Sequence, residues 1–594
     1  MAAWEERFRA RRVSLPDWAR DVPDRSVVSA TTEAGVVEAH SWVVGGDLVT
    51  ATSRPDGTSG ATIDPSGQWV WWFDDEGGDE RGVWRRQPFG TGPGEAVDAT
   101  GLEPAYSSGL ALGDGVAVVG STDDGYGVRV HVVPAGGAAR EIYTHREEAY
   151  VGDLSRAGDL VVLAHSEHGD SRHPALRVVR VRDGSTVADL FDGPGKGLHP
   201  LGFSPVDGDP RLLVVHERDG APALLVWNPV TGTERLLTLP VDGEVADADW
   251  WPDAGSVLVA LDHHARTRLV RLDLGTGDVS DVGPMTGTVT SFAVRDDGDV
   301  WATWSSAAQP SSVRRLTTAG ANDLLLAAPG PAAPESVAVQ DLWVDGPGGK
   351  VHALLRTPVT DGPWPTVVEV HGGPTHHEVD AFGAYASTWI DHGYALVQVN
   401  YRGSTGYGSA WRDALEERVG HIELEDVRAV RDHLIATGIA DPSCIVLAGA
   451  SWGGFITLLG LGLDPHGWSL GLAGVPVADY VAAYEDEMEG LKAFDRSLFG
   501  GSPNDVPAKY ADSSPITYVD RVRVPVLVLA GENDPRCPIR QIDNYVARLA
   551  ELDVPHQVYR YDAGHGSLVN DERVRQMRVE LDFAAAHLGT TPAL

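Results

Sequence analysis

The hydrophobic and polar positions of the chain follow two different patterns, which change near residue 330. From residue 31 to residue 330, short apolar runs such as residues 160–164 and 256–260 are separated by turns rich in Gly, Asp and Pro. Each run leads through a polar turn into a second apolar run, and such units recur at about 40 residues, the spacing typical of propeller blades. The pattern predicts a β-propeller of seven blades over residues 31–330; a pair of packed β-sheets is the alternative.

The pattern changes after the segment Pro331-Ala332-Ala333-Pro334, where apolar runs begin to alternate with helical periodicity. Amphipathic helices are predicted over residues 424–436 and 540–551. This alternation predicts an α/β domain over residues 335–590. The first 30 residues match neither half. Residues 5–12 resemble a helix, and we expect this N-terminal extension, residues 1–30, to pack on the α/β domain.

One short motif in the α/β region suggests chemistry. Gly449-Ala450-Ser451-Trp452-Gly453-Gly454 follows the apolar run 445–448 and precedes the helix-like run 455–459. A Gly-x-Ser-x-Gly pattern between a strand and a helix is typical of a nucleophile elbow, in which the serine sits on a strained turn. The bare pattern also arises by chance in a chain with 69 glycines. The partners of Ser451 therefore decide between a nucleophile and an ordinary turn.

A candidate acid follows the next strong strand signal. The apolar run 524–530 ends in Gly531-Glu532-Asn533-Asp534-Pro535. An Asp just after a central strand stands where an α/β-hydrolase places the acid that orients the catalytic histidine. Asp534 is the candidate; a turn or cap role is the alternative, because Asn-Asp-Pro favours turns. Asp562 is a rival, but it lies too close in sequence to the candidate histidine to approach it from a separate strand.

A candidate base follows the last predicted strand, residues 557–561. His565 lies there between two glycines, and the chain order Ser, Asp, His is that of an α/β-hydrolase. A surface histidine is the alternative reading of His565. His556 is a rival base, but it precedes the strand and so belongs to the opposite end of the sheet.

Two backbone N–H groups are candidates for an oxyanion hole. The residue after the nucleophile, Trp452, supplies one in this fold, and a loop after an early strand supplies the other. The predicted strand 366–370 leads into His371-Gly372-Gly373-Pro374, in which glycine lets an N–H approach the substrate closely. We predict Gly373 as the second donor, with a plain strand-to-loop turn as the alternative.

The composition of the chain limits which partners it can bind. Its 594 residues, 42% of them apolar, are enough for two folded domains, and the formal net charge is −38. Such acidity disfavours nucleic acid and anionic membranes as partners, since both require basic patches. Neither a required metal nor an organic cofactor is predicted. The sequence does not decide whether the chain forms a homo-oligomer.

Cysteine usage and the N-terminus point to the cytoplasm. Cys444 and Cys537 are the two cysteines; they form no zinc pattern and imply two independent reduced thiols. Residues 1–12 are charged and lack the apolar core of a secretory signal. The sequence contains no run of 18 apolar residues, so no membrane span is predicted. We therefore expect a cytoplasmic protein.

A propeller followed by a hydrolase with these motifs resembles the prolyl oligopeptidase family of serine peptidases, and the His-Gly-Gly-Pro loop resembles its acylaminoacyl-peptidase and aminopeptidase branch. The resemblance implies that Ser451, Asp534 and His565 form a catalytic triad and that Gly373 and Trp452 donate to the oxyanion. Trp452 stands where relatives commonly have Tyr, which keeps the N–H but changes the pocket wall. The best-matched segments are residues 371–374, 400–408, 449–454 and 514–519.

The resemblance also implies an internal cavity between the domains that admits short peptides or small amides. Three functions stay open: an aminopeptidase or acylaminoacyl-peptidase-like exopeptidase, an amide hydrolase acting on an aminoacylated small molecule such as an antibiotic, and an esterase or silent scaffold. An exopeptidase that holds a protonated amine needs a carboxylate near the nucleophile.

Several charged residues are candidates for binding substrate. Glu485 or Glu487 is the predicted anchor for the amine, with a solvated acidic helix face as the alternative; Asp79 and Glu80 are weaker candidates. Arg536, beside the candidate acid, could bind a substrate carbonyl or carboxylate, or form a structural salt bridge.

Overall fold

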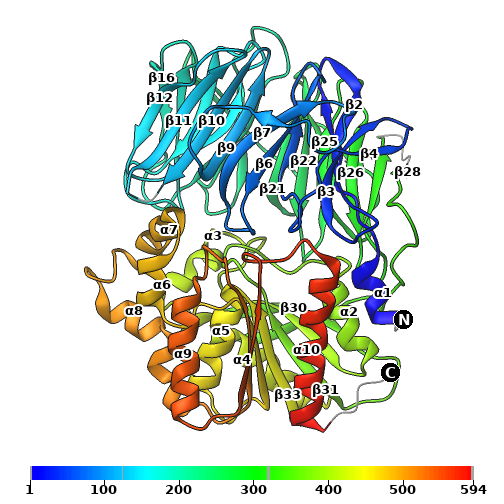
Figure 1. Cartoon of the computed structure of the whole chain (residues 1–594), viewed down its shortest axis with the longest axis vertical. Helices are drawn as coiled ribbons and strands as arrows, with labels where there is room; N and C mark the ends of the chain where they lie inside the picture. The colour runs from blue at the N-terminus through cyan, green and yellow to red at the C-terminus, as the bar shows by residue number, and fades with distance from the viewer. Residues whose placement is uncertain (1–2, 124, 318–321, 590–594) are drawn as a thin grey trace.

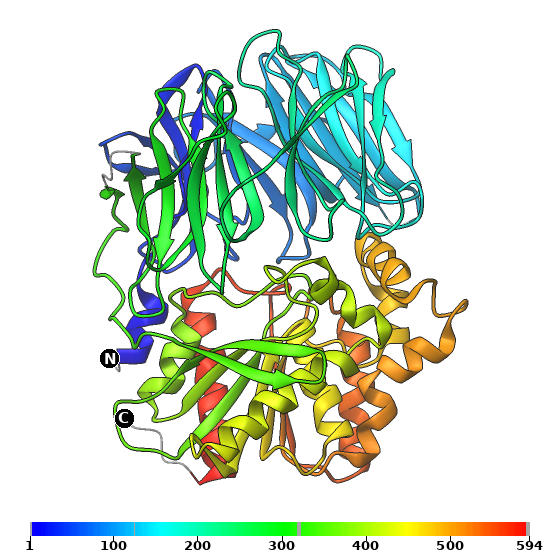
Figure 2. The same cartoon turned by 180° about the vertical axis from the view of Figure 1, so that it is seen from behind.

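The structure, a computed structural model, describes residues 3–123, 125–317 and 322–589. A ring of β-sheets stacks on a domain in which helices flank a single sheet (Figure 1). The opposite view shows the same two layers and places the N-terminal helix beside the α/β domain (Figure 2). The predicted order, a β-propeller followed by an α/β domain, is confirmed.

The propeller consists of antiparallel sheets whose strands follow one another in chain order. Within the described residues there are five separate four-stranded sheets and one eight-stranded sheet. The four-stranded sheets are β1(Asp17–Ala19) to β4(Leu48–Thr50) with β2(Val22–Thr31) and β3(Val37–Val43); β13(Ala149–Leu154), β14(Leu160–His165), β15(Ala175–Arg180) and β16(Thr186–Leu190); β17(Leu198–Phe203), β18(Leu212–His216), β19(Ala223–Asn228) and β20(Thr233–Leu237); β21(Glu244–Trp250), β22(Ser256–Asp262), β23(Thr267–Asp273) and β24(Val279–Val282); and β25(Thr288–Val294), β26(Val300–Ser305), β27(Ser312–Leu316) and β28(Asn322–Leu326).

The eight-stranded sheet joins two runs of four strands. Its strands are β5(Ala61–Ile63), β6(Trp69–Asp75), β7(Arg81–Pro88), β8(Val97–Asp98), β9(Ala105–Gly113), β10(Val116–Asp123), β11(Gly127–Pro134) and β12(Arg140–His145). The two runs meet where β7 pairs with β9, through Arg81 opposite Tyr106 and Gly82 opposite Ala105. The link is therefore two residue pairs long.

The first sheet begins earlier in the chain than the predicted boundary at residue 31. β1 and all but the last residue of β2 lie within residues 1–30, and β2 pairs with β3 from Arg25 opposite Val43 to Thr31 opposite Val37. Polar residues such as Asp24 and Arg25 interrupt the apolar pattern of β2. Pairing with β3 decides that this segment is a strand, and such pairing is not visible in the local sequence.

The N-terminal helix α1(Ala3–Arg9) packs on the α/β domain. It contacts α2(Ala384–Asp391) and α10(Asn570–Leu588). Trp4 and Phe8 are buried in the same apolar cluster as Trp389 and Leu581. The helix thereby ties the start of the chain to its C-terminal half.

The ring closes by side-chain packing between its first and last sheets. Trp301 of β26 lies edge-on to Trp18 at 5.7 Å between ring centroids and also packs on Trp42 at 6.1 Å. The Arg295 guanidinium stacks on Trp301 at 3.8 Å and donates a hydrogen bond of 2.8 Å to the carbonyl of Pro23. Aromatic and cation–π contacts therefore join the two ends of the propeller.

The α/β domain is built on an eight-stranded sheet in the order β29-β30-β32-β31-β33-β34-β35-β36. β29 and β30 form an antiparallel edge, and the remaining strands are parallel. The strands are β29(Gln340–Gly346), β30(Gly349–Arg356), β31(Trp364–Val370), β32(Ala395–Asn400), β33(Ala440–Ala450), β34(Leu470–Gly474), β35(Val526–Gly531) and β36(His556–Tyr561).

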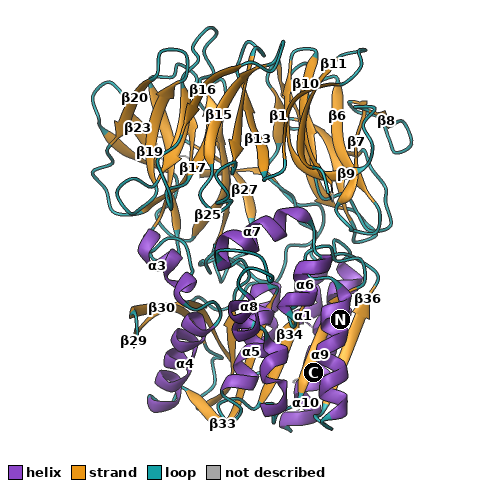
Figure 3. Ribbon diagram, turned by 90° about the vertical axis from the view of Figure 1, so that its left-hand side faces the viewer, coloured by secondary structure: helices purple, strands orange, loops and turns teal. Residues whose placement is uncertain are grey.

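Helices cover both faces of this sheet (Figure 3). Besides α2 and α10, they are α3(Ser409–Asp413), α4(His421–Ala436), α5(Trp452–Leu463), α6(Tyr480–Asp486), α7(Glu489–Phe499), α8(Pro507–Ser513) and α9(Ile539–Glu551), with the 3-10 segments η1(Ala414–Glu417) and η2(Pro515–Arg521). α3 and α7 lie at the boundary with the propeller. No helix in the described ranges is sufficiently long and apolar to cross a membrane.

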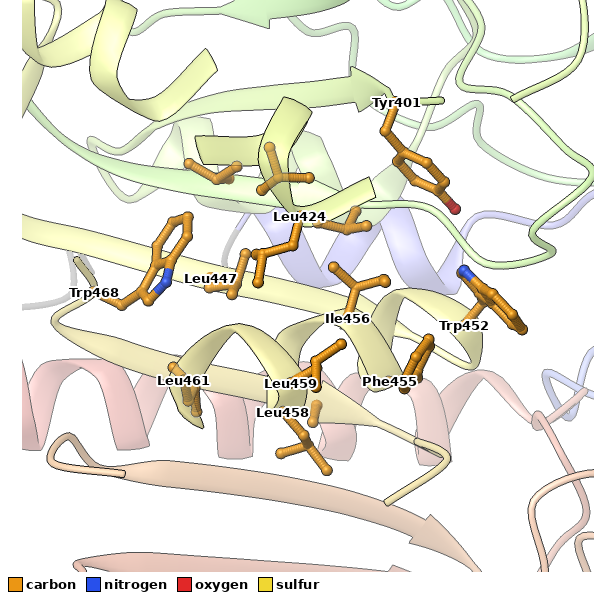
Figure 4. Close-up of a cluster of buried hydrophobic side chains, with 14 of the residues drawn as sticks. Tyr401, Leu424, Leu447, Trp452, Phe455, Ile456, Leu458, Leu459, Leu461 and Trp468 are labelled. Carbon is orange, nitrogen blue, oxygen red and sulfur yellow. The ribbon is translucent and has the colours of Figure 1, made fainter. Parts of the chain in front are cut away.

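The helix α5 contributes many apolar side chains to the hydrophobic core on one face of the sheet. Phe455, Ile456, Leu458 and Leu459 are fully or almost fully buried in an apolar cluster that extends to Trp452 at the start of the helix (Figure 4). Burial of such side chains contributes about 1.5–3 kcal/mol each. The apolar run after Ser451 therefore anchors the first turn of α5 against the sheet.

Candidate active site

The serine of the Gly-x-Ser-x-Gly motif lies on a sharp turn between β33 and α5. Ser451 has φ 56° and ψ −118°, a strained backbone conformation for a residue with a side chain. Its amide donates a hydrogen bond of 2.9 Å to the carbonyl of Gly474 on the neighbouring strand. The geometry is that of a nucleophile elbow.

The glycines of the motif are required by close backbone approach. A Cβ on Gly453 would lie 1.9 Å from the Val370 carbonyl oxygen, and one on Gly449 would lie 2.6 Å from the same atom. No side chain fits at either position. The sequence pattern therefore reports how tightly the turn is packed between strand and helix.

Asp534 and His565 are hydrogen-bonded to each other. The Asp534 Oδ2 accepts from His565 Nδ1 at 2.7 Å, and its Oδ1 accepts from the amides of Arg536 at 2.8 Å and Cys537 at 3.0 Å. The Asp534 side chain is fully buried and that of His565 is 18% exposed. A carboxylate held in this way fixes the orientation of the imidazole and favours its Nδ1–H tautomer.

Sheet topology puts all three residues at one edge. β33, β34, β35 and β36 are parallel neighbours, with Ala450 opposite Gly474 and Gly531 opposite Tyr561. Ser451, Asp534 and His565 each follow the carboxyl end of one of these strands. Ligand sites of open α/β sheets form at this edge. The rival residues lie elsewhere: Asp562 accepts from Asn533 at 3.2 Å, and the His556 Nδ1 contacts the Val554 carbonyl at the far end of β36.

The His-Gly-Gly-Pro loop approaches the serine turn. A Cβ on Gly372 would lie 3.4 Å from Ser451 Cβ and 4.0 Å from the Trp452 amide nitrogen. Gly373 has φ 131°, a conformation that L side chains rarely adopt. The two predicted oxyanion donors therefore belong to segments that are in contact.

His371 holds this loop in place. Its ring stacks on Tyr401 at 4.2 Å, its Nε2 bonds the Ser404 hydroxyl at 2.8 Å, and Tyr401 donates to the His371 carbonyl at 3.0 Å. Burial lowers the pKa of His371 to about 3, so its imidazole is neutral near pH 7. We interpret His371 as a structural residue.

The propeller covers the loops that carry the acid and the histidine. A turn between β6 and β7 reaches down, where Asn533 donates to the Gly77 carbonyl at 3.1 Å. A Cβ on Gly564 would lie 1.9 Å from the Gly78 carbonyl oxygen. The two domains are therefore in direct contact beside His565.

Two cavities open at this domain boundary. One of about 510 Å³ is lined by residues that include Glu80, Glu148, Thr375 and Arg536. The other, of about 490 Å³, is lined by residues that include Glu80, Arg536 and His565. Both are large enough for a small molecule or a few residues of peptide.

Comparison with known proteins places the C-terminal domain in a family. The model of the prolyl oligopeptidase family matches residues 381–591. These residues form a prolyl oligopeptidase family domain. The resemblance inferred from the sequence motifs is thereby confirmed.

Curated relatives match about a third of the chain. The chain is 29% identical over 210 residues to dipeptidyl peptidase family member 6 of Caenorhabditis elegans, covering 34% of this chain and 28% of that protein. It is 31% identical over 208 residues to the acylamino-acid-releasing enzyme of Arabidopsis thaliana, covering 33% and 26%. It is 29% identical over 212 residues to the dipeptidyl aminopeptidase BIII of Pseudoxanthomonas mexicana, covering 35% of this chain and 31% of that protein. The similarity thus spans less than a third of each relative's length.

Solved structures match over both domains. A puromycin hydrolase superposes with a TM-score of 0.83 at 23% identity, covering 99% of this chain and 97% of that chain. The acylaminoacyl peptidase of Pyrococcus horikoshii superposes with a TM-score of 0.74 at 17% identity, covering 99% and 98%. At these identities the likeness establishes the shared two-domain fold.

The predicted amine anchors of this peptidase-family domain do not line the cavities. Glu485 is exposed and pairs with Arg540 at 2.7 Å. Glu487 is 4% exposed, and burial together with nearby Asp495 raises its pKa well above the usual range. Burial likewise raises the pKa of Asp495 to about 8. Glu487 therefore lies near a second buried carboxyl group, whereas the adjacent Met488 lines both cavities.

Arg536 does lie at the cavities, together with a weaker candidate. Its guanidinium binds Glu80 of the propeller through Nε at 2.7 Å and Nη2 at 3.1 Å. Asp79 instead accepts from the amides of Glu76 and Arg81 and so shapes the β6–β7 turn. The salt-bridge alternative for Arg536 is thus observed, and it crosses the domain boundary.

Glu148 is a cavity residue that the sequence prediction missed. Its carboxylate lines the larger cavity, and no hydrogen-bond partner for it lies among the described residues. Burial raises the pKa of Glu148 to about 7, although Arg496 opposes the shift. In the sequence it stands in the pair Glu147-Glu148, just before β13, where it resembles any polar residue of a propeller loop.

The two thiols differ in their surroundings. Cys444 and Cys537 are both free and buried. Burial, with Asp534 nearby, raises the pKa of Cys537 well above its usual range. The Cys537 side chain is therefore a neutral thiol beside the Asp534–His565 pair.

Proposed function

We propose that the protein is a serine hydrolase whose triad is Ser451, His565 and Asp534. The observation that carries the proposal is the 2.7 Å bond from His565 Nδ1 to the buried Asp534, at the sheet edge where Ser451 occupies a strained elbow. The family domain over residues 381–591 supports it. A structural ion pair beside an ordinary turn would not require the elbow glycines.

The proposed mechanism follows from this arrangement. His565 Nε2 takes the proton of the Ser451 hydroxyl as the oxygen attacks the substrate carbonyl, and Asp534 stabilises the imidazolium. The amides of Trp452 and Gly373 donate to the developing oxyanion. His565 then gives its proton to the leaving amine, and water hydrolyses the acyl-enzyme by the reverse proton path.

We further propose that the substrates are short peptides or small amides that are cut near their N-terminal end. Cavities of about 510 and 490 Å³ between the domains fit a few residues and exclude a folded protein. Relatives that match about a third of the chain are named as acylamino-acid-releasing enzymes and dipeptidyl aminopeptidases. Both names describe enzymes that act at the N-terminus of a chain.

Glu148 is the proposed acceptor for a substrate ammonium group, in place of Glu485 or Glu487. Its carboxylate faces the larger cavity without a hydrogen-bond partner in the described residues, whereas Glu80 is already neutralised by Arg536. An ammonium ion would satisfy this carboxylate through charge-assisted hydrogen bonds. The free carboxylate favours a substrate with a free amine over a blocked one.

A second candidate function is hydrolysis of an aminoacylated small molecule. The observation that favours it is the superposition with a puromycin hydrolase over 97% of that chain. It uses the same proposed triad and amine site, so only the leaving group differs. An esterase remains the third candidate and would prefer activated esters over amides.

The proposed function is tested with paired aminoacyl p-nitroanilides, one set with free amines and one N-acetylated, together with puromycin. We expect the wild-type protein to cleave the free-amine set and Ser451→Ala to lose about 10³-fold or more of kcat/KM. Cleavage of the acetylated set alone would overturn the amine site. Turnover that persists in Ser451→Ala would overturn the triad, and turnover of puromycin alone would favour the second candidate.

We also infer that the propeller has seven blades. The eight-stranded sheet consists of two antiparallel runs, β5 to β8 and β9 to β12, joined by two residue pairs. Counting each run as one blade adds two blades to the five four-stranded sheets. An experimental structure that showed β7 and β9 paired along their full length would contradict this count.

A further inference from the structure

Three residues of metal-binding type meet beside the proposed triad. The Cys537 sulfur, a carboxylate oxygen of Asp534 and a ring nitrogen of His565 all lie within 4.8 Å of one another. It is the one group of three such residues found in the described part of the chain. The proposed triad uses Asp534 and His565 and assigns no role to the thiol.

This set of ligands suits zinc. Zn²⁺ binds thiolate, imidazole and carboxylate at about 2.0–2.3 Å, so ligand atoms around it lie roughly 3–4 Å apart. The three ligand atoms lie within 4.8 Å of one another, so a closer approach by about 1 Å brings them to that geometry. Two anionic ligands also balance the charge of the ion, which burial requires.

The surroundings support binding at this place. Asp534 Oδ1 is held by the amides of Arg536 and Cys537, so the carboxylate is already oriented. His565 is 18% exposed and lines the 490 Å³ cavity, which provides a route for the ion. The formal net charge of −38 attracts cations toward the protein.

We propose that Asp534, Cys537 and His565 form an inhibitory Zn²⁺ site. The ion binds the Cys537 sulfur, one Asp534 oxygen and Nδ1 of His565. The proton of the Cys537 thiol leaves to water. The Nδ1 proton moves through solvent to Nε2, so the ring stays neutral and Nε2 no longer accepts the Ser451 proton. The inhibitory effect rests on the proposed serine hydrolase function, but the binding does not.

Binding is measured in the Ser451→Ala background, which separates it from catalysis. Co²⁺ serves as the probe because a cobalt–thiolate bond gives a near-ultraviolet charge-transfer absorption. We expect the band with Ser451→Ala and with Ser451→Ala/Cys444→Ala, and its loss in Ser451→Ala/Cys537→Ala. Absence of the band in Ser451→Ala, or its retention without Cys537, would overturn the site whatever the protein hydrolyses.

Inhibition is measured as the Zn²⁺ concentration that halves each variant's own metal-free rate. Loss of a ligand should weaken inhibition at least about tenfold in Cys537→Ala, because loss of an outer-shell partner alone costs ~10–100-fold in metal affinity. Cys444→Ala should match the wild type. Mg²⁺ and Ca²⁺, which prefer oxygen ligands, should not inhibit. Equal sensitivity of Cys537→Ala and the wild type to Zn²⁺, or inhibition by Ca²⁺ equal to that by Zn²⁺, would overturn the inhibitory site.

Discussion

At the scale of single residues, this protein combines groups that the fold satisfies with groups that it leaves unsatisfied. Ser451 is held at φ 56° by packing on either side, and Asp534 accepts three hydrogen bonds. Glu148, in contrast, lines a cavity without a hydrogen-bond partner among the described residues. Backbone strain costs stability, and a carboxylate that lines a cavity without a protein partner is available to bind a ligand, so both are more informative about function than the satisfied core.

Glu148→Gln is expected to weaken recognition of free-amine substrates. A hydrogen bond to a charged group contributes about 1.5–3 kcal/mol, so KM should rise about 10–100-fold for free-amine anilides. Acetylated anilides should be unaffected, since they carry no ammonium group. Glu485→Gln is the matched control, because that carboxylate is exposed and pairs with Arg540.

The pH profile provides a second measure of the same site. Because the pKa of Glu148 is about 7, its ionised fraction increases as the pH rises through 7. The wild-type ratio of kcat/KM for free over blocked substrates should therefore rise through that range, until the substrate amine loses its proton above about 8. Glu148→Gln should remove the rise on the acid side. An unchanged profile in this variant would contradict the assignment.

At the scale of elements, the turn between β33 and α5 decides where Ser451, the proposed nucleophile, lies. The apolar side chains of α5 are buried against the sheet, and Gly453 lets the helix start in contact with the Val370 carbonyl. The conformation of Ser451 is therefore enforced by packing on both sides of the turn.

Gly453→Ala should destabilise the α/β domain. Its new methyl group would lie 1.9 Å from Val370 O, and overpacking costs about 1–3 kcal/mol or more. For a domain of this size we expect the thermal unfolding midpoint to fall by about 5 °C or more, measured by calorimetry. Gly92→Ala is the control, because its methyl group would meet no atom within 4 Å. Equal midpoints for the two variants would contradict the packing argument.

At the scale of the whole molecule, a network of charged residues joins the domains. Arg172 of the propeller binds Asp413 at 3.2 Å, and Asp170 accepts from Ser497 of α7 at 2.6 Å. His173 lies between them, with Nδ1 at 2.9 Å from Asp170 and Nε2 at 3.8 Å from Asp413. These contacts hold the propeller over the proposed active site.

His173 should make the stability of the assembled domains depend on pH. Burial by itself would lower the pKa of His173, but the hydrogen bond to Asp170 and the negative charges of Asp170 and Asp413 outweigh it and raise the pKa to about 9. Its stabilising contribution is therefore fully present below the unfolded-state value of about 6.5 and is lost as the pH rises through 9.

The corresponding experiment compares His173→Gln with the wild type by calorimetry at several pH values. The wild type should unfold at a higher temperature near pH 6, and the difference should shrink between pH 7 and pH 9.5. His466→Gln changes an exposed histidine after α5 and should show no such difference. A difference for His173→Gln that stays constant with pH would contradict the raised pKa.

Much of the architecture was predictable because it depends on local patterns. Strand-turn-strand units in one half and alternating strands and helices in the other distinguished the two domains. The predicted helices over residues 424–436 and 540–551 correspond to α4(His421–Ala436) and α9(Ile539–Glu551). Amphipathic periodicity is a property of neighbouring residues, so it survives without knowledge of the tertiary structure.

The sequence by itself determined the fold class and the order in which Ser451, Asp534 and His565 follow their strands, because elbow glycines and buried strands leave short motifs. Only the tertiary structure decided that β1 and β2 belong to the propeller and that Glu487 lies near Asp495. It also decided that Glu148 lines a cavity and that Cys537 lies beside the Asp534–His565 pair. Those outcomes depend on contacts between segments far apart in the chain. Burial and charge at such contacts are set by what packs there, which no local pattern records.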